Sequence, residues 1–131
     1  MDLDRMQYRA DDVNRHLASM FEGYLEPHRR MLVAVVEGDG YIPGLNFVFG
    51  LATPGIGVAT VYTKRLWATS PSLYMERIAK EITHEVGHLL GLEHCSNPTC
   101  VMSFSNSVGD VDRKGPGFCD SCTLKLSRLI G

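Results

Sequence analysis

The sequence predicts a compact α/β fold, a single small domain over residues 1–131 in which a twisted mixed sheet packs on helices. Apolar residues recur at helical spacing over residues 11–25 and again from Ser70 onward. Short apolar runs at 31–36, 46–51 and 57–63 lie between these two stretches and are typical of strands. A length of 131 residues with 44% apolar residues suits one soluble globular domain.

The first predicted elements are a helix and a strand. Val13 and Leu17 belong to an apolar stripe that follows Asp11, a candidate N-cap, so residues 11–25 predict an amphipathic helix. Residues 31–36 form a continuous apolar run, which is typical of a strand covered on both faces in the interior of a sheet.

The next elements are two strands and a long helix. Residues 46–51 and 57–63 predict a strand pair, because Pro54-Gly55 between them is a strong turn signal. The long helix spans residues 71–90, with Pro71 in its first turn. Its apolar stripe, which lies roughly opposite the histidines, consists of Ile78, Ile82 and Val86.

The chain closes with a loop and a short helix. Pro116-Gly117 interrupts any regular element, and an apolar set that follows predicts a C-terminal helix. That set consists of Leu124, Leu126, Leu129 and Ile130.

The long helix carries the pattern H-E-x-x-H-x-x-G-x-x-H. His84 and His88 are four residues apart, so at ~100° per residue they project about 40° apart and can share one metal ion. Gly91 accepts the left-handed conformation that turns the chain back toward the metal, and His94 is then the third ligand. Three neutral imidazoles leave an open position on a tetrahedral zinc.

Glu85 points about 100° away from His84 around the helix, where it can hold a water rather than bind the metal. Zinc lowers the pKa of a bound water from about 15.7 toward about 7, so Glu85 becomes the general base in peptide-bond hydrolysis without an acyl-enzyme. The alternative is a chance match with a solvated glutamate, against which Gly91 and His94 both argue.

Four cysteines follow the histidine motif and form a complete tetrahedral set for a structural zinc, namely Cys95, Cys100, Cys119 and Cys122. Two disulfides or a redox-active C-x-x-C are the alternatives. Met1 is followed by charged residues instead of a signal peptide, which predicts a cytoplasmic protein with reduced thiols. The C-x-x-C also follows a Gly-Pro-Gly loop rather than a βαβ unit.

The pattern from His84 to Cys122 resembles the archaemetzincins, a branch of the metzincin zinc peptidases, because the third histidine runs into C-x4-C-x-M and a distant C-x-x-C. Residues 41–50 are also similar to the family's segment upstream of the helix. The resemblance implies a metzincin-like fold whose C-terminal loop and helix are stabilised by zinc. Family members begin with a further strand and helix, so it also implies that this chain lacks a strand and has an unpaired sheet edge.

The resemblance assigns roles to the ligand residues. It implies a catalytic zinc on the three histidines, Glu85 as general base, a structural zinc on the four cysteines, and hence two Zn²⁺ ions per chain. Met102 would be the Met-turn methionine beneath the imidazoles. Some other metzincin branches place a tyrosine two residues later, where this chain has Phe104.

The predicted partner is a peptide or protein substrate of a monomeric enzyme. The resemblance places an edge strand above the zinc cleft, and residues 46–50 are the candidate for pairing with an extended peptide. In the alternative, this strand is internal and Phe47 and Phe49 pack in the core. Thirteen basic against fifteen acidic residues, a net charge of −2 and no membrane-length apolar stretch argue against nucleic acid and membrane partners. A zinc-stabilised peptide-binding module with little turnover is the second functional hypothesis.

Overall fold

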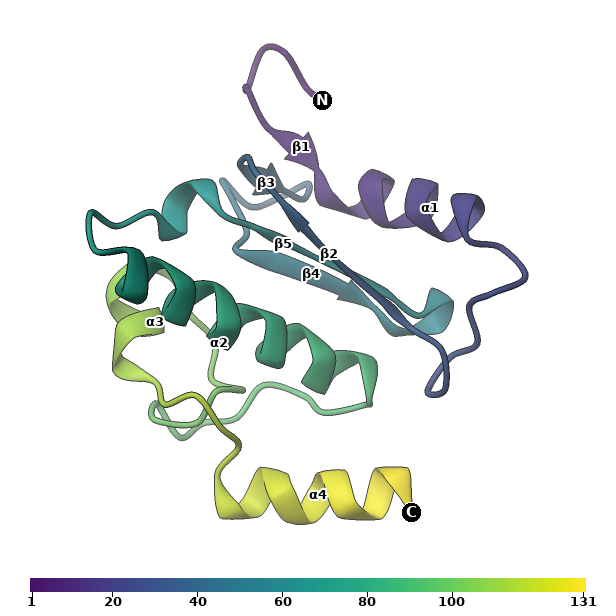
Figure 1. The fold of residues 1–131 in the computed structure, drawn as a ribbon, viewed down its shortest axis with the longest axis vertical. Coiled ribbons are helices and arrows are strands. Elements are labelled where there is room, and N and C mark those ends of the chain that lie inside the picture. Colours follow the sequence, from purple (N-terminus) through teal and green to yellow (C-terminus); the bar gives the residue numbers. More distant parts are fainter.

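A three-stranded sheet forms the centre of the computed structural model, which describes all residues 1–131 (Figure 1). Its strands are β2 (Leu32–Val36), β5 (Val58–Tyr62) and β4 (Gly50–Thr53), in that spatial order. β2 runs parallel to β5, whereas β4 runs antiparallel to it. The predicted mixed sheet is therefore confirmed, with β5 as its central strand.

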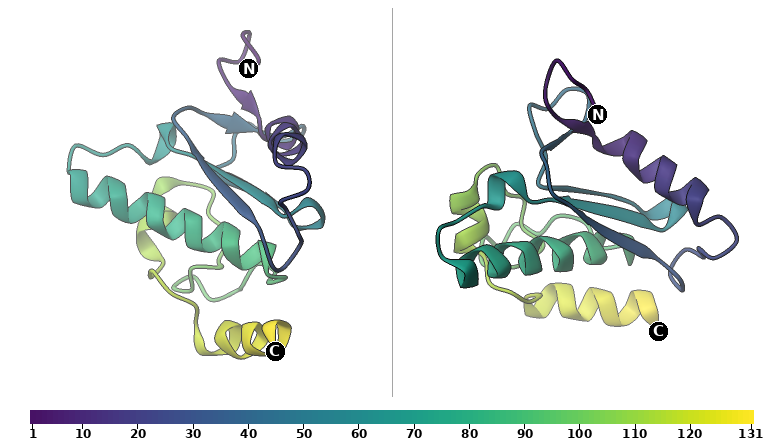
Figure 2. Two further views of the ribbon diagram at one scale, coloured as in Figure 1. Left: turned by 45° about the vertical axis from the view of Figure 1, so that its right-hand side comes forward. Right: turned by 45° about the horizontal axis from the view of Figure 1, so that its top comes forward.

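Two helices cover the sheet from opposite sides (Figures 1 and 2). α1 (Ala10–Met20) and α2 (Pro71–Leu89) both contact β4 and β5. Every residue of β5 is buried, since this strand has a neighbour on each edge and a helix on each face. The main apolar cluster between the sheet and α2 consists of Phe49, Val61, Leu66, Ile78 and Val111.

The remaining elements are short and frame the site. They are β1 (Tyr8–Arg9), β3 (Gly40–Tyr41), the 3₁₀ turns Pro54–Ile56 and Lys64–Leu66, α3 (Val108–Arg113) and α4 (Asp120–Ile130). β1 pairs in parallel with β3, and the sequence had predicted neither of these strands nor α3. The predicted C-terminal helix is confirmed as α4, which lies beyond α2 from the sheet (Figure 1).

The long helix forms where the sequence predicted it. Ser70 caps α2 because its side-chain oxygen accepts a hydrogen bond from the Leu73 N–H, and Pro71 occupies the first turn. Ile78 is buried, and Ile82 packs beside it against the same apolar cluster. One face of α2 is therefore attached to the sheet, and another remains available for polar groups.

The first helix is shorter than predicted. α1 begins after Arg9, so Asp11 lies in its first turn and is not the N-cap. It ends at Met20 because the chain turns around Gly23, which is a poor helix former. The residue that ties α1 to the sheet is polar: Asn14 is fully buried, donates to Leu51 O at 3.1 Å and accepts from Thr60 Oγ1 at 2.8 Å.

Two strand predictions were wrong in position. β2 lies at one edge of the sheet rather than in its interior, and 48% of Val35 is exposed. Residues 46–49 precede the strand instead of belonging to it. Phe49 O still accepts from the Tyr62 N–H of β5, but backbone groups of Asn46 and Val48 bond to other parts of the chain. Arg5 and Gln7 both donate to Asn46 O, and the Val48 N–H donates to Gly40 O.

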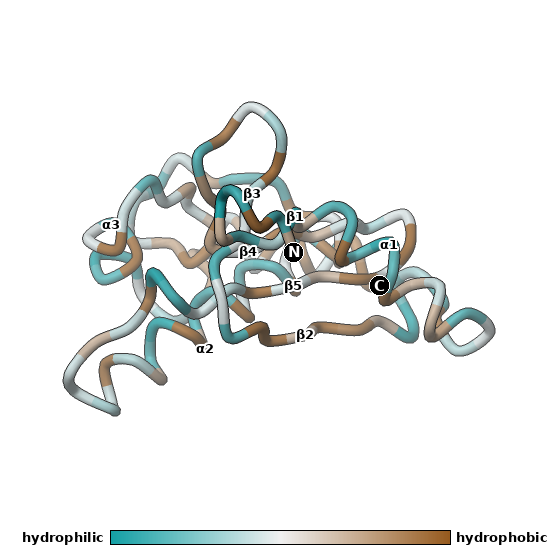
Figure 3. Tube along the Cα trace, turned by 90° about the horizontal axis from the view of Figure 1, so that it is seen from above, coloured by the Kyte–Doolittle hydropathy of each residue, from teal (hydrophilic) through white to brown (hydrophobic).

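Apolar residues concentrate on the sheet, and the helices are of mixed character. Figure 3 shows hydrophobic stretches along β2 and β5 between more hydrophilic loops. None of the helices is both long enough and apolar enough to cross a membrane.

Candidate metal centres

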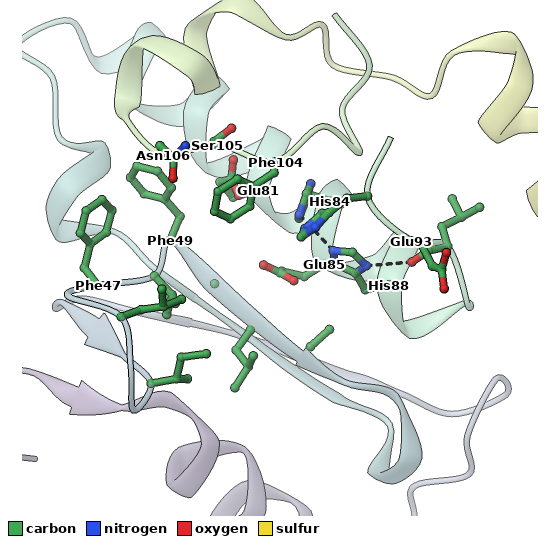
Figure 4. Close-up of a pocket in the computed structure, with 18 of the residues that line it drawn as sticks. Phe47, Phe49, Glu81, His84, Glu85, His88, Glu93, Phe104, Ser105 and Asn106 are labelled. Atoms are coloured by element: carbon green, nitrogen blue, oxygen red, sulfur yellow. Dashed lines mark hydrogen bonds between the residues drawn. The ribbon is translucent and has the colours of Figure 1, made fainter. Parts of the chain in front are cut away.

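Three imidazoles converge beside the C-terminal half of α2. His84 and His88 lie on successive turns, and their Nε2 atoms are 3.1 Å apart (Figure 4). His94 joins them from the segment after the helix, so that one nitrogen of each ring lies within 4.8 Å of the others. The structure thus brings together all three histidines that the sequence predicted as ligands of one ion.

The turn at Gly91 makes this convergence possible. Gly91 has φ of +107° and donates to His88 O at 3.0 Å, while the Leu92 N–H donates to Gly87 O at 2.9 Å. These two bonds form a Schellman motif, which ends a helix and reverses the chain. The predicted role of Gly91 is confirmed, and His94 lies within reach of the other two rings because of it.

Two backbone carbonyls orient the helical histidines. His84 Nδ1 lies 2.7 Å from Val101 O, and His88 Nδ1 lies 2.8 Å from Leu92 O. Since a carbonyl can only accept, each Nδ1 carries the proton and each Nε2 presents its lone pair to the cluster. Burial and the nearby Lys114 charge lower the pKa of His84 to about 3, and burial likewise lowers the pKa of His88. Both rings are therefore neutral, as metal ligands must be.

Glu85 is a buried carboxylate next to the histidines and not a solvated surface residue. Only 4% of its surface is exposed, and its neighbour across the site is Gly50 of β4. A Cβ on Gly50 would overlap the Glu85 carboxylate and come within 2.8 Å of Thr60 O. Burial, and then the Glu81 charge, raise the pKa of Glu85 to about 8. The strand residue therefore has to be glycine for Glu85 to keep this position.

The four cysteines form a second cluster. Their sulfur atoms all lie within 4.8 Å of one another, with Cys95 Sγ and Cys119 Sγ 3.8 Å apart. The Cys122 N–H, at the start of α4, lowers the pKa of Cys119 to about 7, whereas burial raises the pKa of Cys122. Cys100 Sγ accepts hydrogen bonds from the Met102 and Cys119 N–H groups. A set of four sulfurs with one thiol already acidified matches the donors of a structural zinc site.

One short segment, residues 100–103, connects the two clusters. It supplies the Cys100 thiol and the Val101 carbonyl that orients His84. Met102 is fully buried against α2, with its sulfur beside Gly87, and its carbonyl accepts from the Cys95 N–H at 3.0 Å. Its assignment as the Met-turn methionine stays a prediction. Its packing couples the cysteine cluster to the helix that carries the histidines.

A cavity of about 740 Å³ opens beside the histidines. One side is α2, and the other includes Gly50, Leu51 and Ala52 of β4, whose outer edge has no strand partner. Phe104 lies at the rim with 54% of its surface exposed, and its ring centroid is 5.3 Å from that of His94. The site is therefore open to an extended ligand along the edge of the sheet.

Sequence reasoning missed a charged pair in this cavity. Glu81 and Lys114 both line it, and their Oε1 and Nζ atoms are 3.0 Å apart. Glu81 could have been noticed, since it precedes Glu85 by one helical turn. Nothing in the sequence marks Lys114, which reaches the site only through the fold of residues 103–114.

A helix that presents two imidazoles and a carboxylate, followed by a glycine turn that returns a third imidazole, defines the metzincin class of zinc metallopeptidases. The family model for "Peptidase family M54" matches residues 1–128. The chain belongs to this family, the archaemetzincins, and is a zinc metallopeptidase.

Relatives and solved structures agree with this assignment. The archaemetzincin of Aeropyrum pernix is 58% identical over 128 residues, which are 98% of this chain and 69% of the relative. That of Pyrobaculum aerophilum is 52% identical over 99% of this chain and 77% of the relative. The crystal structure of the Methanopyrus kandleri archaemetzincin superposes with a TM-score of 0.83 at 44% identity, over 96% of this chain and 67% of the other.

A zinc-dependent peptidase from Methanocorpusculum labreanum is also similar in structure. Its TM-score is 0.86 at 34% identity, over 96% of this chain and 78% of the other.

Gly50→Ala should displace the Glu85 carboxylate, because the added methyl group and the carboxylate cannot occupy the same space. We expect kcat/KM for peptide cleavage to fall by roughly 100-fold, the loss typical of a misplaced catalytic group. Steady-state kinetics and zinc content would be measured together. Gly55→Ala is the control, since a Cβ there meets nothing within 4 Å. A Gly50→Ala variant with wild-type kcat/KM would contradict the packing argument.

Proposed function

We propose that this chain hydrolyses peptide bonds with one zinc ion held by His84, His88 and His94 and with Glu85 as the general base. The observation that carries the proposal is the position of Glu85, a buried carboxylate next to three neutral imidazoles at an open cavity. A purely structural metal site needs neither this carboxylate nor the cavity.

Zinc bound there would act as a Lewis acid and lower the pKa of a water ligand. Glu85 would accept a proton from the attacking water and deliver it to the leaving amine. Burial and the neighbouring Glu81 raise the pKa of Glu85, and the positive charge of a bound zinc would oppose this shift and favour the carboxylate form that accepts the proton. The carbonyls of Val101 and Leu92 would keep both helical imidazoles in the tautomer that binds metal.

We propose further that an extended peptide pairs with the free edge of β4. We assign peptide pairing to this edge instead of to residues 46–50, because most of those residues lie outside β4. Because the Tyr62 N–H donates to Phe49 O, the antiparallel alternation leaves the backbone groups of Gly50 and Ala52 directed away from β5. Such pairing recognises the backbone of many sequences.

The cysteine cluster is proposed to hold a second, structural zinc, giving two ions per chain. The mutual approach of all four sulfurs supports one four-ligand site over two separate disulfide pairs. We also propose that the protein is a monomer and is cytoplasmic. In the cytoplasm its thiols would stay reduced and so remain available for the metal.

Glu85→Gln should abolish cleavage while zinc stays bound, because the amide keeps the shape of the side chain and cannot accept the proton. We expect kcat to fall by at least about 100-fold. Cleavage of an unstructured peptide library and metal content by mass spectrometry would be measured on the same sample. A variant that keeps its zinc and still cleaves would rule out Glu85 as the base. If the wild type binds peptides without cleaving them, the protein is a binding module instead.

Chelation should distinguish the two zinc sites. Zinc-supplemented protein should carry one ion for each of the two ligand clusters, and a chelator should remove the histidine-held ion first. His94 is exposed and the cavity is open, whereas Cys100 and Cys122 are buried. Cys119→Ser is the matched variant that should lose the chelator-resistant ion. Recovery of at most one ion with cysteine disulfides in its place would contradict the two-zinc proposal.

Ala52→Pro should weaken substrate binding, because it removes an N–H from the free edge of β4 without touching the β5 ladder. We expect KM to rise about fivefold with kcat nearly unchanged, the loss of one hydrogen bond. Ala52→Val, which keeps the N–H, is the control. An unchanged KM in a folded Ala52→Pro variant, or a crystal structure with an inhibitor backbone paired elsewhere, would refute the edge proposal.

A further inference from the structure

A buried ion pair at the cavity wall is assigned neither metal binding nor proton transfer in the proposed chemistry, although its charges influence the pKa values of Glu85 and His84. The Glu81 side chain is 4% exposed and that of Lys114 is fully buried, with their charged atoms 3.0 Å apart. Lys114 also donates to Ser103 O at 3.4 Å. A buried pair contributes little net stability, because the attraction is offset by the loss of hydration of both charges. A contribution to stability therefore does not explain why the pair lies beside the active-site cavity.

The pair is incompletely satisfied. Glu81 Oε1 is buried with the Lys114 ammonium 3.0 Å away, at an angle that departs from that of a regular hydrogen bond. Ser105 Oγ, which belongs to another residue lining the cavity, is buried without a partner. Nearly all buried polar groups in native proteins have a partner, and an unpaired one costs about 1–3 kcal/mol. Ser105 Oγ is such an unpaired atom, and it lines the same cavity as the irregularly bonded Glu81 Oε1.

Beside Glu81, Lys114 and Ser105, the cavity is lined by aromatic side chains. Phe47 and Phe49 pack edge to face with ring centroids 5.2 Å apart, and Phe104 lies on the other side, next to His94. Figure 4 shows Phe49, Phe104, Glu81 and Ser105 together on one side of the imidazoles. A side chain that enters here would contact ring faces first and polar atoms beyond them.

The charges of Glu81 and Lys114 limit the kind of substrate side chain that can bind in this part of the cavity. A cationic side chain would approach Lys114, and an anionic one would approach Glu81, so both are disfavoured in a site of low dielectric. A purely apolar side chain would leave the polar atoms unpaired. A neutral group that both donates and accepts a hydrogen bond at the end of an aromatic body fits both parts of the cavity. The phenol of tyrosine does both, whereas the indole N–H of tryptophan only donates.

We propose that Glu81, Lys114 and Ser105 form the polar end of a side-chain subsite that selects tyrosine over phenylalanine next to the scissile bond. This inference rests on the proposed peptidase function, whose substrate it specifies. The phenol O–H would donate to the Glu81 carboxylate, and its oxygen would accept from Ser105 or Lys114. A site built to bind a hydroxyl group discriminates against the analogue that lacks it, because its own polar atoms then stay unpaired.

The test uses the hydroxamates of N-acetyltyrosine and N-acetylphenylalanine, which differ by one hydroxyl group and need no turnover. On zinc-loaded protein, calorimetry should show the tyrosine compound binding roughly tenfold more tightly, which corresponds to about one well-formed buried hydrogen bond. A matched pair of peptides with tyrosine or phenylalanine beside the cleaved bond should differ similarly in kcat/KM.

Two variants assign the preference to these residues. Ser105→Ala should reduce the tyrosine preference severalfold, and Glu81→Met combined with Lys114→Met should abolish it while phenylalanine binding is kept or improved. Exchanging a buried pair for apolar residues of similar size is often tolerated by the fold. Glu26→Met combined with Arg29→Met is the control, since this exposed pair lies outside the cavity. It should leave the preference unchanged.

These measurements test the tyrosine subsite and the proposed peptidase activity separately. Equal binding of the two hydroxamates to the wild type, no binding of either, or a preference unchanged in both Ser105→Ala and the double variant would overturn the subsite. If the tyrosine hydroxamate binds more tightly in the predicted residue-dependent way but no peptide is cleaved, the subsite stands and the proposed peptidase function fails.

Discussion

The reversal of the chain after α2 is the constraint on which the rest of the site depends. The Schellman motif at Gly91 ends the helix within one turn of His88 and directs Leu92 back under it. The Leu92 carbonyl then fixes the ring of His88, and His94 arrives beside both helical imidazoles. A helix one turn longer would carry His94 away from the other two rings, since each turn adds about 5.4 Å.

The same reversal connects the histidine cluster to the cysteine cluster. Cys95 follows His94 directly, and its N–H bonds to the Met102 carbonyl, so the chain between the centres is short and paired. Residues 100–103 then contact both clusters, through Cys100 on one side and the Val101 carbonyl on the other. A sulfur cluster at this place can hold the imidazoles in position without contributing a ligand to them.

The polar face of α2 carries several buried titratable groups. Glu81, His84 and Glu85 are all buried, and each has a stated environment: an ion pair, a carbonyl hydrogen bond, and the cavity beside Gly50. Burial keeps the imidazoles neutral and raises the pKa of both carboxyl groups, so the fold sets the protonation of the groups to which we assign metal binding and proton transfer. Burying these titratable groups lowers the stability of the fold, and it gives each group a defined protonation state.

The sequence by itself determined α2, its start near Ser70 with Pro71 in the first turn, and the ligand spacing, because helical periodicity, the place of proline and the i, i+4 relation are local properties of the chain. It likewise determined the central strand β5 and the cysteine set. Only the tertiary structure decided that β2 lies at an edge and that β4 begins at Gly50 rather than at Asn46. Those outcomes depend on side chains distant in sequence, such as Arg5 and Gln7, which bind the Asn46 carbonyl. The pairing of Glu81 with Lys114 also arose from packing between distant segments, and no local pattern encodes such contacts.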